Sequence, residues 1–167
     1  VHTADHSATP GLLERLDIGQ AHILPVSPNA DLVALANHRM ELCLVDLAKK
    51  KLTVLDRSAH PPSYGLDWSP DGRWLAYDYA DTAQTYCLKL CDTKTGKTHR
   101  ITTPVLADVA PSFDPEGKYL YFLGARDLDP VYDALYFDLN FPRTVRPYLL
   151  TLRKDLPSPF LPLPRAP

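Results

Sequence analysis

The chain has 167 residues, of which 18 are Lys or Arg and 20 are Asp or Glu, so its formal net charge is −2. This balance, without a basic stripe, argues against a nucleic-acid partner. No apolar run is long enough to cross a bilayer as a helix, which argues against a membrane partner.

Residues 1–19 show little regular pattern. The segment 15–18 is predicted to be a strand, and 12–16 is a weak helical candidate. No other segment repeats its apolar residues with the 3.6-residue period of a helix, so the chain is predicted to be all-β.

Residues 20–60 read as four short strands, at 22–26, 32–36, 42–47 and 51–56. The turn Ser27-Pro28-Asn29-Ala30 separates the first two. Pro suits the second position of a type I turn, and Gly is common at its end. Ala30 occupies that end, where a left-handed backbone would cost on the order of 1 kcal/mol, so a different turn type is expected here.

Residues 61–107 repeat this pattern of four strands with a turn between the first two. The turn Ser69-Pro70-Asp71-Gly72 closes a hairpin, and the predicted strands are 64–68, 74–78, 86–91 and 98–102. A polar turn at 92–97 joins the last two.

Residues 108–154 form a third copy around the turn Asp114-Pro115-Glu116-Gly117. Its predicted strands are 110–113, 119–123, 134–139 and 147–152. Residues 155–167 are rich in Pro, which cannot continue a sheet, and are predicted to be a linker toward domains outside this chain.

The three turns recur with a period of about 40 to 50 residues, which is typical of propeller blades. The second strand of each copy is a near-continuous apolar run, as expected where sheets pack face to face. The predicted fold is therefore an all-β propeller fragment with about three four-stranded antiparallel blades, 20–60, 61–107 and 108–154. Closed propellers usually have about four to eight blades. Residues 1–19 are accordingly expected to end a preceding blade.

The three cysteines, Cys43, Cys87 and Cys91, lie in apolar strands. Their odd number and apolar setting indicate buried free thiols in a reducing compartment. A cytoplasmic location is therefore predicted.

Candidate catalytic and metal-binding sets are weak. Asp56, Ser58 and His60 invite comparison with a catalytic triad, but closeness in sequence on a polar connection does not make the spatial relay that a triad needs. The six histidines lack paired ligand spacing. Asp127, Asp129 and Asp133 resemble the start of a calcium loop, but Val131 and Tyr132 occupy positions that need an oxygen ligand and a Gly. We therefore assign no catalytic, cofactor or metal residue, and expect no cofactor.

Two further groups of side chains have ordinary structural interpretations. The aromatic residues of the second copy are expected to fill space between blades; they are Trp68, Trp74, Tyr64, Tyr77, Tyr79 and Tyr86. A basic group near the end of the third copy is expected to be a solvated face; it comprises Arg143, Arg146, Arg153 and Lys154.

The third copy resembles tricorn-type proteases. The matching segments are Arg126-Asp127-Leu128-Asp129-Pro130-Val131-Tyr132-Asp133-Ala134, Phe137-Asp138-Leu139, Phe141-Pro142, Arg146-Pro147-Tyr148-Leu149 and Pro157-Ser158-Pro159-Phe160. Residues 108–162 carry this resemblance, which matches the final blade of the family's seven-bladed propeller.

The resemblance implies a cytoplasmic serine peptidase that forms homohexamers and trims oligopeptides released by a larger protease. The propeller would be a scaffold and substrate-access channel. The nucleophilic Ser, its His and the oxyanion donors would lie in later domains, so this segment would be inactive alone. Its implied partners are the remaining blades, the catalytic domains and oligopeptides in transit.

Two alternatives share the same turn pattern. A TolB-type propeller would be a periplasmic scaffold for protein partners. A propeller of prolyl-oligopeptidase type would precede a hydrolase domain with a Gly-x-Ser-x-Gly elbow, a motif that this chain lacks.

Overall fold

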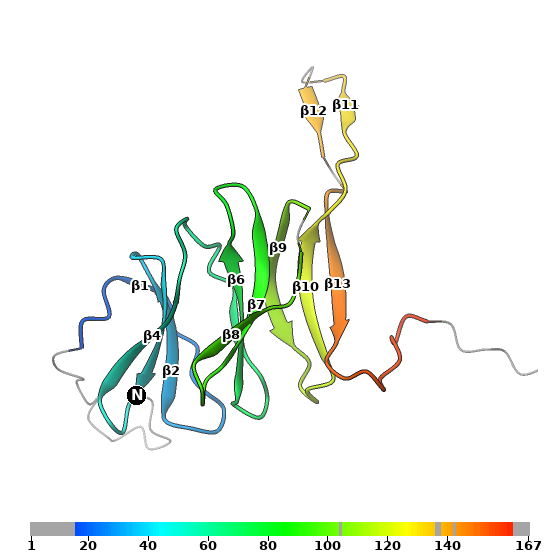
Figure 1. Ribbon diagram of the computed structural model, residues 1–167. Coiled ribbons are helices and arrows are strands. Elements are labelled where there is room, and N and C mark those ends of the chain that lie inside the picture. Colours follow the sequence, from blue (N-terminus) through cyan, green and yellow to red (C-terminus); the bar gives the residue numbers. More distant parts are fainter. Residues whose placement is uncertain (1–15, 104, 136–137, 142, 162–167) are drawn as a thin grey trace, which may run out of the picture.

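The computed structural model describes residues 16–103, 105–135, 138–141 and 143–161 (Figure 1). These residues form thirteen strands and no helix, so this part of the chain contains no helix that could span a membrane. The prediction of an all-β fold is confirmed.

The first blade is a four-stranded antiparallel sheet whose strands pair in chain order. Its strands are β1 (Ala21–Ile23), β2 (Leu32–Asn37), β3 (Glu41–Asp46) and β4 (Lys51–Arg57). They lie within a few residues of the four predicted strands.

The second blade has the same antiparallel order. Its strands are β5 (Leu66–Trp68), β6 (Trp74–Ala80), β7 (Tyr86–Asp92) and β8 (Lys97–Arg100). All four were predicted. A parallel contact at Tyr86 and Ala107 joins this sheet to the next one.

The third blade differs from the prediction. Its sheet contains β9 (Ala107–Phe113), β10 (Tyr119–Ala125) and β13 (Val145–Thr151), with β13 paired directly to β10. The predicted third strand at 134–139 is wrong. The described residues of that segment belong instead to a separate hairpin of β11 (Val131–Asp133) and β12 (Asp138–Asn140), inserted between β10 and β13. The apolar residues of this insertion resemble a blade strand in sequence, but the insertion does not pair with the sheet of the blade, because β13 occupies the edge of β10.

The three turns close their hairpins in the same way. The backbone N–H of the first turn residue donates a hydrogen bond to the carbonyl of the first residue of the next strand, from Ser27 to Leu32, Ser69 to Trp74 and Asp114 to Tyr119, at 2.8, 2.8 and 2.9 Å. Gly72 and Gly117 have a φ of 67°, whereas Ala30 does not have a positive φ. The first turn is therefore of a different type, as its Ala predicts.

The core lies between facing sheets. Leu42 and Leu44 of the first blade pack against Trp68, Leu75 and Tyr77 of the second. This apolar layer covers one face of each sheet. A separate cluster around Leu35 and Cys43 covers the other face of the first blade. Both faces of β2 and β3 are therefore buried, which explains their nearly continuous apolar sequences.

A second apolar layer joins the second and third blades. Ala76 and Leu88 pack against Leu120 and Phe122 of β10. Side chains of β10 alternate between buried and exposed positions because only one of its faces meets another sheet.

The ends of the chain are less regular. Residues 16–18 carry no strand, contrary to the prediction for 15–18, although Leu16 and Ile18 pack against the first blade. The weak helical candidate falls almost wholly on residues 1–15, outside the described residues. Residues 155–161 also carry no strand. The assignment of both ends to a preceding blade and a linker stays a prediction.

Candidate functional site

A group of interacting polar side chains lies at the interface between the first and second blades, which we call the seam. Asp56 of β4 accepts hydrogen bonds from the Tyr77 hydroxyl at 2.6 Å and the Lys89 ammonium at 2.9 Å. The Lys89 ammonium also lies 3.1 Å from the centroid of the Tyr79 ring. Burial, followed by the hydrogen bond to Asp56, raises the pKa of Tyr77. Its hydroxyl therefore remains a neutral donor to Asp56 and is unsuited to act as a base.

A second polar network lies on the first-blade side of the seam. The Asn37 amide donates to the buried Glu41 carboxylate at 2.9 Å, and Arg57 forms an ion pair with Glu41. The hydrogen bond from Asn37 is the largest influence that lowers the pKa of Glu41. Glu41 is therefore ionised and its carboxylate is bound by Asn37 and Arg57. This arrangement is typical of a structural residue.

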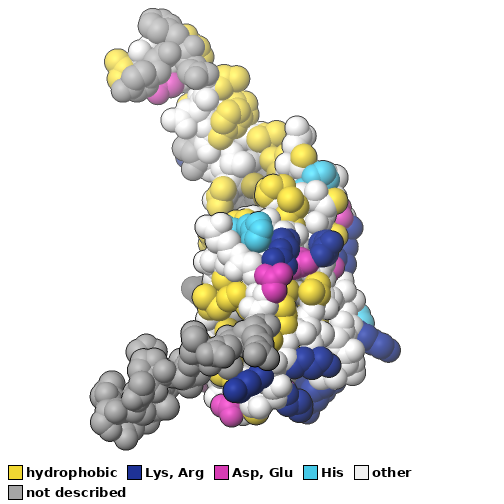
Figure 2. Space-filling model, turned by 90° about the vertical axis from the view of Figure 1, so that its left-hand side faces the viewer, with side chains coloured by type: hydrophobic (Ala, Val, Ile, Leu, Met, Phe, Trp, Pro, Cys, Tyr) yellow, Lys and Arg dark blue, Asp and Glu magenta, His cyan; other side chains and the backbone are white. Residues whose placement is uncertain are grey.

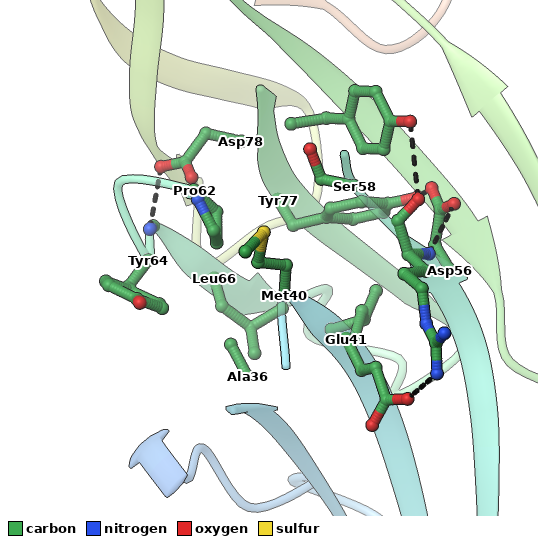
Figure 3. A pocket seen from close by; sticks show the side chains of 14 residues that line it. Ala36, Met40, Glu41, Asp56, Ser58, Pro62, Tyr64, Leu66, Tyr77 and Asp78 are labelled. Atoms are coloured by element: carbon green, nitrogen blue, oxygen red, sulfur yellow. Dashed lines mark hydrogen bonds and ion pairs between the residues drawn. The ribbon is translucent and has the colours of Figure 1, made fainter. Parts of the chain in front are cut away.

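A small pocket of about 30 Å³ separates these networks from Asp78 (Figure 3). It can hold one or two water molecules but no peptide. Asp78 is buried and accepts a 2.7 Å hydrogen bond from the Gly65 amide, while its other oxygen has no hydrogen-bond partner among the described residues. Burial raises the pKa of Asp78.

The residues considered for a triad do not form a relay. The Ser58 hydroxyl donates to the Ala80 carbonyl at 2.8 Å and accepts from the His60 backbone amide at 3.0 Å. Asp56 is occupied by Tyr77 and Lys89. The structure thus uses all three residues of the set in other contacts, and none of these is a hydrogen bond from Ser58 to the His60 imidazole.

The described residues contain no group of three or more His, Cys, Asp or Glu side chains placed to hold a metal ion. Of the carboxylates that resemble a calcium loop, Asp127 forms an ion pair with Arg146 at 3.5 Å. This aspartate supports the base of the β11–β12 hairpin.

Cys43, Cys87 and Cys91 are free and buried, as predicted. Burial raises the pKa of the Cys43 and Cys91 thiols to about 11. Thiols with such pKa values are almost entirely protonated near neutral pH and are poor nucleophiles.

The aromatic residues of the second blade mainly serve packing. Trp68 is buried, and its indole N–H donates to the Pro25 carbonyl of the neighbouring blade at 3.0 Å. Tyr64 packs on His22 with ring centroids 4.4 Å apart.

The predicted basic group is not one patch. Arg143 and Arg146 lie at the start of β13 and Arg153 lies beyond its end, a separation of about 20 Å at roughly 3.3 Å per residue. Arg146 pairs with Asp127 and Arg153 pairs with Asp155, and all three arginines are exposed.

One anchored ion pair is not apparent from the sequence. Arg126 donates two hydrogen bonds to the fully buried Asp108, at 3.0 and 2.6 Å. Its guanidinium also lies 4.9 Å from the centroid of the Tyr148 ring. The apolar context of Asp108 was the available signal, because an acidic residue in a buried strand needs a partner.

Comparison with known families identifies the domain. Residues 1–167 match the tricorn protease second beta propeller domain. The chain belongs to this family. The resemblance in the third blade is thereby confirmed and extends over the whole chain.

Relatives of this tricorn propeller segment are much longer than it is. The chain is 40% identical over 136 residues to a tricorn protease homolog of Saccharolobus solfataricus, covering 81% of this chain and 13% of the relative. It is 37% identical over 155 residues to tricorn protease homolog 1 of Streptomyces coelicolor, covering 93% and 14%. The chain therefore spans only a small part of the curated relatives that it matches.

Solved structures show the same fold. The crystal structure of the tricorn protease superposes with a TM-score of 0.79 at 28% identity, over 89% of this chain and 15% of the other. A TolB structure from Agrobacterium tumefaciens gives a TM-score of 0.55 at 22% identity, over 75% of this chain and 43% of the other, a likeness of fold alone.

Proposed function

We propose that this segment is a scaffold in the wall of a substrate-access channel of a tricorn-like serine peptidase, which degrades oligopeptides downstream of a larger protease. The observation that carries the proposal is the match of the whole chain to the second propeller domain of tricorn protease. The polar side chains of the blade seam support a structural role, because they are engaged with one another. Catalysis by an activated serine would then take place in another domain.

The arrangement of the strands suggests which side faces the channel. Propeller blades stand around a central channel. Strands β5 and β9 contact each other between blades, whereas β13 forms the far edge of its sheet. We therefore place the first strand of each blade beside the channel, where Ser112 of β9 is exposed.

Size selection provides the test. In the intact polypeptide, Ser112→Cys would be labelled with a bulky polyethylene-glycol maleimide, and kcat/KM would be measured for a tripeptide and a decapeptide. The native cysteines are buried, so labelling of this domain is directed to the new thiol. We expect kcat/KM for the decapeptide to fall about tenfold or more and that for the tripeptide to change less than about twofold.

The matched control is Lys97→Cys on β8, an exposed position on the outer strand of the second blade. Labelling there is expected to affect neither peptide. Equal effects of both labels, or no effect at Ser112→Cys, would contradict a channel beside β9.

We also infer that the intact protein is a cytoplasmic homo-oligomer. The three free thiols support a reducing compartment. Light scattering on the intact protein tests the assembly, and a monomer at micromolar concentration would refute it. Fractionation of the source cells tests the location, and recovery outside the cytoplasm would refute that part.

A further inference from the structure

The hairpin inserted between β10 and β13 is longer than the blade requires. We call residues 126–144 the arm. The β10–β13 pairing ends at Ala125 and Val145, and a loop of about two to five residues would ordinarily join such a pair. The arm instead forms its own strands, β11 and β12, and projects beyond the sheets (Figure 1). An insertion of this length usually has a function of its own.

The root of the arm is firmly anchored. Arg126, its first residue, forms the two-bonded ion pair with the fully buried Asp108. The neighbouring Gly124 permits this approach, because a β-carbon there would lie 2.7 Å from the Tyr148 ring. A second ion pair, between Asp127 and Arg146, spans the base. These contacts fix the direction in which the arm leaves the blade.

The outer part of the arm exposes large apolar side chains. Tyr132 is 61% exposed and Leu135 is 77% exposed, and Val131 and Phe141 are exposed as well. Apolar side chains gather along this projecting part of the molecule (Figure 2). A two-stranded hairpin is only marginally stable alone in water, and a cluster of exposed apolar residues marks an interaction site.

We propose that the arm docks onto an apolar surface of another domain of the same polypeptide. The matched segment makes up 10% to 17% of the length of the relatives, so most of their polypeptide lies outside it. The arm has fewer residues than the about 20 to 30 that each side of a stable, independent interface contributes. Tethering raises the effective concentration into the millimolar range, which makes so small a contact sufficient within one polypeptide.

The partner surface follows from the side chains of the arm. A shallow apolar depression would receive Leu135 and Phe141, and an acceptor at its rim would receive the Tyr132 hydroxyl, which usually finds a hydrogen-bond partner when buried. The inference uses the family relationship but does not depend on the peptidase or channel role.

Thiol accessibility in the intact polypeptide tests the proposal. Leu135→Cys is prepared with Val105→Cys as the control, a residue that is 63% exposed outside the arm. Maleimide labelling at each cysteine is followed by peptide mass spectrometry, in native buffer and in denaturant. We expect native labelling at Leu135→Cys to be at least about tenfold slower than in denaturant after correction for the intrinsic effect of denaturant, as protection by a docked domain requires.

Three outcomes are decisive, and none uses catalytic activity as a readout. Protection at Leu135→Cys that persists on hundredfold dilution supports docking within one polypeptide. Labelling as fast as in denaturant overturns the proposal. Protection that disappears on dilution also overturns it, because the occupant is then a second copy. An intact polypeptide that shows this protection but has no peptidase activity would count against the proposed function alone.

Discussion

The Tyr77 hydroxyl donates a 2.6 Å hydrogen bond to the Asp56 carboxylate and thereby joins β6 of the second blade to β4 of the first. Lys89 reaches the same carboxylate oxygen from β7. Apolar packing brings the two sheets together without strong directional preference. The shared carboxylate adds direction, because it accepts both bonds only in one relative placement of the sheets.

Removing the Tyr77 hydroxyl should loosen this seam. We expect Tyr77→Phe to lower the free energy of unfolding by about 1.5 to 3 kcal/mol, the range for a hydrogen bond to a charged group. Urea denaturation of the chain, followed by Trp fluorescence, measures the change. Tyr79→Phe is the matched control, because its hydroxyl makes only a 3.4 Å contact with the Arg57 carbonyl. An equal loss in both variants would show that the bond to Asp56 has no special role.

The anchor of the arm should be more sensitive. Arg126→Ala would leave the fully buried Asp108 carboxylate without its cation, a change that typically costs about 3 to 5 kcal/mol. Arg126→Lys keeps the charge but loses the two-bonded geometry, so an intermediate loss is expected.

Arg153→Ala supplies the comparison for the anchor, because Arg153 and Asp155 are both exposed. The free energy of unfolding should change little in this variant, because exposed ion pairs contribute little to stability. Calorimetric unfolding of the three variants should therefore rank Arg126→Ala as the least stable and Arg126→Lys next, with Arg153→Ala close to the parent chain. A parent-like Arg126→Ala would show that Asp108 is satisfied without this arginine.

Asp78 should make stability depend on pH. Burial raises its pKa above the ordinary value of 3.8, so the folded chain keeps this proton over a pH range in which the unfolded chain has lost it. Stability from this group is full below that ordinary value and falls as the pH rises through the folded pKa. Carboxylates such as Asp92, whose pKa is lowered first by the hydrogen bond from Arg73, act in the opposite direction.

The difference between the parent chain and Asp78→Asn isolates this effect. Asn resembles the neutral carboxyl group and still accepts from the Gly65 amide, so we expect Asp78→Asn to be as stable as the parent at acid pH and more stable at about pH 7. Denaturation at a series of pH values gives the two curves. A variant whose stability relative to the parent falls between acid and neutral pH would contradict the raised pKa.

Pro147 should protect the outer edge of the third blade. Leu152 donates to the Lys118 carbonyl at 3.0 Å, and bonded pairs alternate along an antiparallel ladder. The backbone of Pro147, paired with Leu123, therefore faces away from β10. A proline at such a position blocks pairing with another chain. Pro147→Val should leave the free energy of unfolding within about 0.5 kcal/mol but increase self-association, as measured by analytical ultracentrifugation.

The first two blades were readable from sequence because their information is local. The turn from Ser69 to Gly72 and the apolar run that begins at Trp74 determine a hairpin without reference to distant residues. The third blade was not fully readable, because Leu135 has the apolar character of a core strand but lies in an insertion. Whether such a segment joins the sheet depends on whether it or β13 pairs with the edge of β10. That choice depends on tertiary contacts, which the local sequence does not contain.

The polar contacts were harder to predict for the same reason. Asp56 and Lys89 are far apart in sequence, and their meeting depends on how two blades stack. Asp108 could be flagged as a buried acid, but its partner Arg126 could not be chosen from sequence alone. The absence of a relay among Asp56, Ser58 and His60 was expected, since the chemistry of a triad needs tertiary placement rather than sequence proximity.

We propose that this segment supports a peptidase without performing its chemistry. The most direct measurement is kcat of the intact polypeptide on a short peptide after Ser58→Ala, with folding checked by circular dichroism. Ser58 has the only hydroxyl among Asp56, Ser58 and His60, and this hydroxyl donates a hydrogen bond to the Ala80 carbonyl. We predict that kcat changes by less than about twofold. A loss of about a thousandfold or more, as expected on removal of a catalytic nucleophile, would show that this segment takes part in the chemistry.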